Sequence, residues 1–198
     1  TVPLKVVVDG VEYPDTPQTD PAKLLKHMKS FKGASSSACP SPAEFAREFR
    51  RAKNVIAVTL TSGLSGTYNC ALQARHIVKE ENPDANIYVV DSRSTAGSMV
   101  LLVRKIRELI LEGRSFDDIT EQIERYRNEM RIVFSLSSFD TLVKNGRMSK
   151  AAGLIASVLN IRAIATNTPD GHIKVLEKLR GESQTIMRMV EIMGGIKD

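Results

Sequence analysis

Residues 54–68 constrain the fold of this chain more than any other segment. An apolar run rich in β-branched residues, Asn54 to Leu60, leads into a turn of hydroxyl residues and glycines, and a helix is expected from Ser65 to Glu81. A second apolar run, Asn86 to Asp91, follows that helix. Continuous apolar runs are typical of parallel strands buried on both faces, and the order strand, helix, strand predicts a right-handed βαβ unit. We therefore expect an α/β protein with a parallel sheet.

The turn between the first strand and the helix is a candidate anion-binding site. In open α/β sheets the ligand crevice lies at the carboxyl ends of the strands, and Ser62 and Ser65 follow such an end. The first N–H groups of a helix that begins near Ser65 have no partner within the helix and carry the positive end of its dipole. They favour a carboxylate or a phosphate, and Gly63 and Gly66 would let that anion approach closely.

Local signals predict elements on both sides of this unit. A hairpin is expected over Leu4 to Tyr13 because Asp9-Gly10 is a typical type I′ turn. A capping box at Ser41 predicts a helix from Pro42 to Ala52, and the hydroxyl-rich segment Gly33 to Ser37 is expected to be a loop. The other expected elements are helices over 21–31, 95–112, 116–130 and 150–159, a short helix ending at Lys144, and a strand over 131–137.

Polar side chains follow three of the expected strands. Thr61-Ser62 follows the first, Asp91-Ser92 the second, and Ser135 to Ser138 the third. If the three strands are neighbours in one parallel sheet, these groups converge on a single crevice. Ser62 and Ser92 would then support the anion site.

The character of the chain changes at residue 161. Two alternating runs, 161–167 and 172–179, flank a Thr168-Pro-Asp-Gly171 turn and predict a hairpin, with a helix over 183–193 after it. We therefore expect two domains. Residues 1–160 would form a Rossmann-like α/β domain, and residues 161–198 would begin a second, α+β domain whose thin core needs a packing partner.

Composition argues against nucleic acid as a partner. The net charge is +5, but Lys and Arg are spread along expected helices and alternate there with Asp and Glu. Aromatic residues make up only 5% of the chain and Trp is absent, so the stacking platforms of a single-strand binder are missing. The positive charge leaves transient contact with an anionic membrane surface open.

Cysteine usage and hydropathy point to a soluble cytoplasmic protein. Cys39 and Cys70 are the only cysteines, and they fit neither a zinc-ligand spacing nor a disulfide framework, so we expect two reduced thiols and no metal site. No apolar stretch approaches the length of about 18 residues that a transmembrane helix needs.

An enzymatic alternative rests on Ser65. Gly63-Leu-Ser65-Gly-Thr67 comes within one residue of the Gly-x-Ser-x-Gly elbow of α/β-hydrolases, the departure being Thr67. Asp91 and His172 follow in the hydrolase order, so a serine hydrolase of acyl substrates stays open. Nucleotide-binding glycine motifs are absent from the sequence, and paired carboxylates for acid and base catalysis are lacking.

Five motifs in order resemble the DegV family, and together they span essentially the whole chain. Thr59 to Tyr68 resembles the family signature Ser-Ser-x-Leu-Ser-Gly-Thr-Tyr. The other matching segments are Ser37–Phe45, with its Pro-Ser-Pro-x-Glu-Phe, Val90–Gly97, Leu142–Ser149, which matches Leu-x-Lys-Gly-Gly-Arg-Ile-Ser, and Ile161–Arg180.

The resemblance implies a two-domain, non-catalytic protein that holds one long-chain fatty acid between its domains and needs no other cofactor. In some bacteria such proteins present the acid to a fatty acid kinase. Carried over to this chain, the carboxylate ligands would be Ser37, Ser65 and Gly66, and Arg147 would contact the kinase or the head group. Cys39 replaces a more usual Gln beside Ser37.

Two departures from the family concern the ends of the chain. Members usually begin with a further strand before the segment matched by Val2-Pro-Leu4, and they continue well beyond Asp198. We therefore expect a trimmed or proteolysed fragment, or a degenerate member, that lacks the first strand and much of the second domain.

Overall fold

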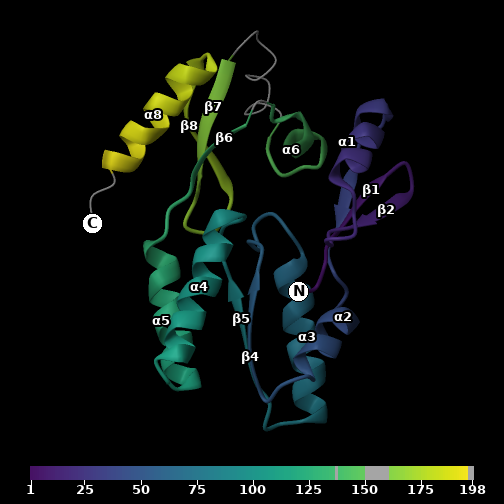
Figure 1. The fold of residues 1–198 in the computed structure, drawn as a ribbon, viewed down its shortest axis with the longest axis vertical. Coiled ribbons are helices and arrows are strands. Elements are labelled where there is room, and N and C mark those ends of the chain that lie inside the picture. Colours follow the sequence, from purple (N-terminus) through teal and green to yellow (C-terminus); the bar gives the residue numbers. More distant parts are fainter. Residues whose placement is uncertain (137, 150–160, 196–198) are drawn as a thin grey trace. The chain divides into compact units, whose positions relative to one another are not determined.

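The computed structural model describes residues 1–136, 138–149 and 161–195. They belong to two compact units, residues 1–130 and 131–198 (Figure 1). The first unit contains a parallel pair of strands flanked by helices, and the second contains an antiparallel sheet. The predicted domain boundary after residue 160 remains a prediction, because a compact unit of chain need not coincide with a domain.

The predicted βαβ unit is confirmed. Strand β4 (Asn54–Thr59) pairs in parallel with β5 (Asn86–Asp91), and α3 (Thr67–Glu81) connects them. The strands are in register from Asn54 opposite Asn86 to Thr59 opposite Asp91, so both strands end at the same edge. The polar turns that follow them are therefore neighbours.

Helices cover both faces of this parallel pair (Figure 1). Successive residues of a strand point to opposite faces. Val89 accordingly packs with α3 and α2 (Pro42–Phe49), whereas Val90 packs with α4 (Gly97–Leu111) and α5 (Phe116–Glu129). Leu102, which is fully buried on the second face, would cost about 2–5 kcal/mol of stability if truncated to alanine.

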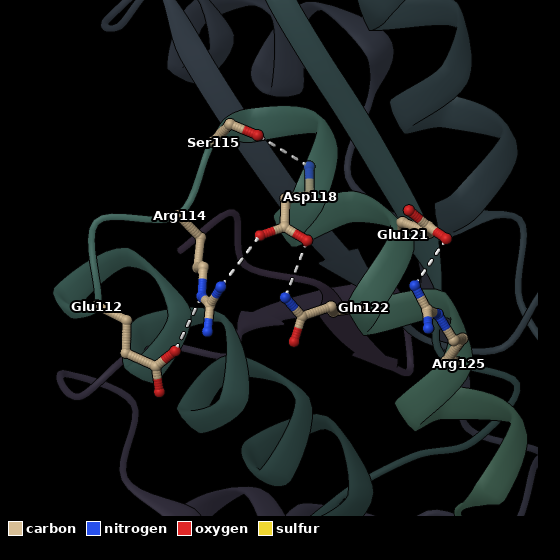
Figure 2. A network of polar contacts seen from close by, with 7 residues as sticks. All are labelled: Glu112, Arg114, Ser115, Asp118, Glu121, Gln122 and Arg125. Carbon is tan, nitrogen blue, oxygen red and sulfur yellow. Dashed lines mark hydrogen bonds and ion pairs between the residues drawn. The ribbon is translucent and has the colours of Figure 1, made fainter.

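Helix caps explain where the flanking helices begin. Ser41 and Glu44 form the predicted capping box of α2, with Ser41 Oγ accepting from the Glu44 amide at 3.3 Å. The Ser41 amide and hydroxyl in turn donate to the Glu44 carboxylate, both at 2.8 Å, and these hydrogen bonds lower the pKa of Glu44. Ser115 accepts from the Asp118 amide at the start of α5, where Asp118 also contacts Arg114 and Gln122 (Figure 2). Each cap of this kind contributes about 1 kcal/mol.

The N-terminal segment forms a small antiparallel sheet in the order β2-β1-β3. Strands β1 (Lys5–Val8) and β2 (Val11–Pro14) make the predicted hairpin, and positive φ at both Asp9 and Gly10 confirms a type I′ turn. Helix α1 (Pro21–Ser30) leads to β3 (Ser36–Ala38). The prediction of a loop over Gly33 to Ser37 was wrong for Ser36 and Ser37, because β1 offers a free edge whose backbone groups pair with any sequence.

The second unit contains an antiparallel sheet in the order β6-β7-β8. It consists of β6 (Val133–Leu136), β7 (Ile161–Asn167) and β8 (Ile173–Arg180), with α6 (Asp140–Lys144) and α8 (Glu182–Gly195). The expectation that the third polar-ended strand joins the parallel sheet was wrong, because β6 pairs with β7, with Phe134 opposite Ala165. The predicted helix over 150–159 lies outside the described residues. None of the helices in the described chain is long and apolar enough to span a membrane.

Candidate functional site

The turn after β4 is organised by the buried residue Thr61. Its carbonyl oxygen accepts hydrogen bonds from the amides of Leu64 (3.2 Å) and Ser65 (3.1 Å), and its hydroxyl accepts from the amide of Gly63 (3.2 Å). Its own amide donates to the carbonyl of Ser94 at 3.0 Å. The backbone therefore reverses tightly around Thr61 and delivers Ser65 and Gly66 to the start of α3.

Ser65 and Gly66 immediately precede α3, which begins at Thr67, two residues later than predicted. Gly66 is the N-cap residue, is exposed, and receives no side-chain cap. Among the described residues its backbone N–H donates to no protein group. Ser65 Oγ accepts from the Thr67 amide (3.3 Å) and lies 2.8 Å from Thr67 Oγ1. An anion here could accept from the Ser65 hydroxyl and from the Gly66 amide, at the positive end of the helix dipole.

Ser62 belongs to a clamp that joins the two strand ends. Both its amide (3.0 Å) and its hydroxyl donate to the carboxylate of Asp91, which also accepts from the Arg93 amide at 3.1 Å. The clamp holds the turn after β4 against the turn after β5. The predicted supporting role of Ser62 therefore takes the form of a structural contact, with its hydroxyl already donated to a carboxylate.

Ser92 is buried, and its hydroxyl is used within its own turn. Ser92 Oγ donates to the carbonyl of Ser94 at 2.8 Å and accepts from the Ser94 amide at 3.1 Å. Arg127 of α5, whose side chain is only 8% exposed, pairs with Glu124 and donates to the carbonyl of Asp91 at 3.4 Å. Hydrogen bonds within the turn, together with the one from Arg127 of α5, therefore hold the turn after β5 in place.

Ser37 lies on β3, opposite Val6 of β1, and is exposed. Two residues further on, Cys39 Sγ lies 3.5 Å from the position that a Cβ on Gly66 would occupy. Its distance to Cys70 Sγ, in the first turns of α3, is 3.6 Å. The end of β3 therefore packs against the start of α3. Two residues of extended chain span about 7 Å, so Ser37 stands close to the candidate anion site.

An apolar pocket of about 560 Å³ adjoins this cluster within the first unit. Thr67, whose hydroxyl contacts Ser65, lines it at one side. The apolar residues that line it include Phe45, Phe49, Ile56, Val58, Met99 and Ile106. A polar cluster next to an apolar pocket is the arrangement expected for an amphipathic ligand with an acidic head.

Arg147 follows α6 in the second unit. Its amide donates to the carbonyl of Leu142 at 2.8 Å and its guanidinium to the carbonyl of Asn145, while Gly146 adopts a positive φ of 71°. The side chain is exposed. The helix stop predicted at Asn145-Gly146 is confirmed, and the role of Arg147 in contacting a partner or a head group stays a prediction.

The geometry gives little support to hydrolysis at Ser65. A nucleophile elbow holds its serine in a strained turn, yet Ser65 is absent from the positive-φ residues of the described chain. The carboxylate of Asp91 accepts from Ser62 and Arg93. His172, in the turn between β7 and β8, lies 3.7 Å from the carboxylate of Asp170. Ser65 is better placed to donate to an anion than to attack a carbonyl.

Several organising groups carried no sequence signal. The contact between the Thr61 amide and the Ser94 carbonyl involves backbone atoms, which any residue has. In the sequence, Arg127 cannot be told from the other basic residues on helices. Its burial, seen only in the structure, shows that it supports the site. Within the described residues no cluster of His, Cys, Asp or Glu could hold a metal ion.

Comparison with known families settles the classification. A family model described as "Uncharacterised protein, DegV family" matches residues 1–198. The chain belongs to the DegV family. A DegV domain-containing protein of Streptococcus pneumoniae is 39% identical over 186 residues, which are 94% of this chain and 66% of the relative. This DegV chain thus spans about two thirds of the length of that relative.

Solved DegV structures share the fold. The Streptococcus pneumoniae Fatty Acid Kinase (Fak) B3 protein, loaded with linoleic acid, has a TM-score of 0.95 and 37% identity, covering 98% of this chain and 69% of that one. A DegV family protein from Eubacterium eligens, loaded with heptadecanoic acid, has a TM-score of 0.93 and 34% identity over 98% of this chain and 70% of that one. The Rossmann-like α/β fold class is therefore confirmed.

Proposed function

We propose that this DegV chain binds a long-chain fatty acid. The carboxylate accepts hydrogen bonds from the Gly66 amide and the hydroxyls of Ser65 and Ser37. The acyl chain, which the family resemblance places between two domains, enters the apolar pocket beside Thr67 in the first unit. The observation that carries the proposal is the exposed residue Gly66, whose N–H donates to none of the described protein groups, next to Ser65 just before α3 and to Thr67, which lines that pocket. The fatty acids held by the similar DegV proteins of S. pneumoniae and E. eligens support the same ligand class.

The two parts of the ligand have different roles in this proposal. Burial of each methylene contributes about 0.8 kcal/mol, so a tail of about fourteen contributes on the order of 11 kcal/mol before the costs of ordering the ligand. A hydrogen bond from a hydroxyl to a carboxylate contributes about 1.5 kcal/mol, and the helix dipole about 0.3–1 kcal/mol. The tail thus supplies most of the affinity, and the start of α3 selects an acid and fixes its orientation.

Ser65→Ala tests the carboxylate contact directly. We expect the affinity for palmitic acid to fall about tenfold, which corresponds to one hydrogen bond to a charged group, while the affinity for hexadecanol changes much less. Fluorescence displacement or calorimetry with both ligands measures the ratio. Equal losses for acid and alcohol would contradict the carboxylate role.

Ser115→Ala is a matched control for this variant. Like Ser65, Ser115 accepts a hydrogen bond from an amide in the first turn of a helix, at 3.2 Å against 3.3 Å (Figure 2). Both variants lose a serine hydroxyl that accepts from an amide of the first helical turn, a hydrogen bond of about 1 kcal/mol. Only Ser65→Ala should change the preference for acid over alcohol. A parallel change in Ser115→Ala would assign the effect to general loss of stability.

The similarity to Fatty Acid Kinase (Fak) B3 supports a further step, in which this chain presents its bound acid to a fatty acid kinase. Arg147 lies at the surface, where a partner can reach its side chain. We expect Arg147→Ala to reduce acyl phosphate formation with an added kinase at least several-fold and to leave acid affinity unchanged. Loss of acid affinity instead would assign Arg147 to the head group. Unchanged acyl phosphate formation would remove it from both roles.

A further inference from the structure

The two cysteines of the chain, 31 positions apart in sequence, face each other beside the proposed ligand site. Cys39 follows β3 and is exposed, and Cys70 lies in the first turns of α3 and is partly buried. Their sulfur atoms are 3.6 Å apart. The sequence contains exactly two cysteines, so an intramolecular disulfide in this chain can only join this pair.

The surroundings of the two thiols allow them to come together. A disulfide bond is about 2.05 Å long, so the sulfur atoms must approach by about 1.5 Å. Cys70 is held in α3, where its amide donates to the Gly66 carbonyl at 3.0 Å. Cys39 lies in irregular backbone between β3 and α2, so the adjustment falls on Cys39 and its side-chain torsion.

We propose that Cys39 and Cys70 form an oxidisable dithiol, which a small peroxide converts into an intramolecular disulfide that joins the end of β3 to α3. The pair is not a structural disulfide. Both cysteines are free in this structure, and Cys39 is exposed. Exposed thiols with a second thiol in reach are typical of reversible oxidation sites.

The chemistry takes place in two steps. The exposed Cys39 thiolate attacks one oxygen of the peroxide, the O–O bond breaks, and Cys39 sulfenic acid and hydroxide form. The Cys70 thiolate then attacks the Cys39 sulfur, the S–S bond forms, and the S–O bond breaks with release of hydroxide. The protons of the two thiols convert both hydroxides to water. Two thiols thus lose two electrons, and hydrogen peroxide is reduced to two waters.

Burial favours this order of events. Desolvation, with a hydrogen bond to Cys39, raises the pKa of Cys70. Because the thiolate is the reactive form, Cys70 is the slower thiol toward an external oxidant. Cys39 is therefore the thiol that meets the peroxide, and Cys70 is the thiol that resolves the sulfenic acid.

The disulfide would also act on the ligand site, a step that rests on the proposed function. Cys39 Sγ contacts the space beside Gly66, and β3 carries Ser37. A covalent link between the end of β3 and α3 holds Ser37 and Ser65 together before the acid binds. Such preorganisation reduces the ordering cost of binding, so we expect the oxidised protein to release its acid on the order of fivefold more slowly.

Mass spectrometry of the ligand-free protein tests the disulfide. After hydrogen peroxide treatment and alkylation of remaining thiols, we expect loss of both alkylation sites and a Cys39–Cys70 cross-linked peptide under non-reducing conditions, reversed by dithiothreitol. The extent should not change on dilution, because the reaction is intramolecular. Cross-linking that yields only dimers, or none, would overturn the proposal.

Two variants test the order of the steps and guard against misfolding. Cys70→Ser should accumulate Cys39 sulfenic acid, captured by dimedone, and Cys39→Ser should leave Cys70 largely unmodified at the same peroxide concentration. The reverse pattern would overturn the assignment of the two thiols. Circular dichroism of each reduced variant should match that of the reduced native chain.

A separate measurement distinguishes this inference from the proposed function. Acid release is measured on reduced and oxidised protein, with Cys70→Ser treated in the same way as control. If the reduced protein binds no fatty acid, the proposed function fails while the disulfide result stands. If the reduced protein binds acid and oxidation leaves release unchanged or makes it faster, the link between the dithiol and the ligand site is overturned.

Discussion

The turns that follow β4 and β5 have similar polar composition and neighbouring positions, but they use their polar groups differently. In the turn after β5, the carboxylate of Asp91 and the hydroxyl of Ser92 are consumed by contacts that hold the two turns in shape. In the turn after β4, the Thr61 backbone and hydroxyl hold the turn, while in the described part of the chain the Gly66 amide donates to no protein group and the Ser65 hydroxyl contacts only Thr67. One turn is therefore a support, and the other is the surface at which we propose that the ligand binds.

The largest effect is expected where the supporting turn is broken. Asp91→Ala leaves the amide and hydroxyl of Ser62 and the amide of Arg93 without their acceptor. We expect the free energy of unfolding to fall by about 2–3 kcal/mol, measured by urea denaturation, and Asp91→Asn to lose less because it keeps one acceptor oxygen. Identical stability of Asp91→Ala and the native chain would show that the clamp does not support the fold.

Ser92→Ala should show most clearly that support of the fold and binding of the ligand depend on different residues. Its buried hydroxyl both donates to and accepts from Ser94, so its removal should cost about 1–2 kcal/mol of stability. The ratio of palmitic acid affinity to hexadecanol affinity should stay the same in the folded variant, in contrast to Ser65→Ala. A fall in that ratio would place Ser92 among the ligand contacts and end the distinction between the two turns.

The sequence was most informative where structure is determined locally. The hairpin turn at Asp9-Gly10 and the capping box at Ser41 both depend on contacts between residues at most three positions apart, and both are confirmed. The start of α3 at Ser65-Gly66 belongs to the same class. Strand β3 and the antiparallel placement of β6 depend on which distant edge is free, and the local pattern carries no information about that.

The same contrast holds for the candidate site. Ser65 and Gly66 follow from the order strand, turn, helix, whereas Ser37 entered only through the resemblance to the DegV family. In the structure, Cys39 Sγ lies beside Gly66, although the two residues are almost thirty positions apart in sequence. Ser37, two residues before Cys39, is related to Ser65 and Gly66 in this way. The different uses of Ser62 and Ser65 could not be predicted either, because both are serines in one turn and only their partners differ.

A smaller effect on the free energy of unfolding is expected at high pH. It concerns Tyr88, which packs with α5 near the supporting turn. Burial and a hydrogen bond to Glu124 raise the pKa of Tyr88 to about 12. The folded protein therefore holds this proton more tightly than the unfolded chain, whose tyrosine pKa is about 10. The resulting stabilisation is complete below pH 10 and is lost as the pH rises through 12.

Tyr88→Phe isolates this contribution from the lysines that titrate in the same range. The variant should show a shallower loss of stability between pH 10 and 12 than the native chain, measured by denaturation at each pH. Tyrosinate absorbance should show one residue ionising later than the others. Parallel pH profiles for the two proteins would indicate that Tyr88 is not the group responsible.

The smallest effect on stability, with a measurable effect on binding, is expected at Gly66. Its φ of −70° suits any residue, and an added Cβ would make an ordinary contact of 3.5 Å with Cys39 Sγ, so Gly66→Ala should change stability by less than about 0.5 kcal/mol. The methyl group would stand beside the exposed N–H at which the carboxylate is proposed to bind. We expect a several-fold loss of palmitic acid affinity with hexadecanol affinity nearly unchanged, measured by calorimetry. If Gly66→Ala binds the acid as well as the native chain, close approach of the carboxylate to this amide is wrong, and Ser65 and Ser37 alone would have to hold the head group.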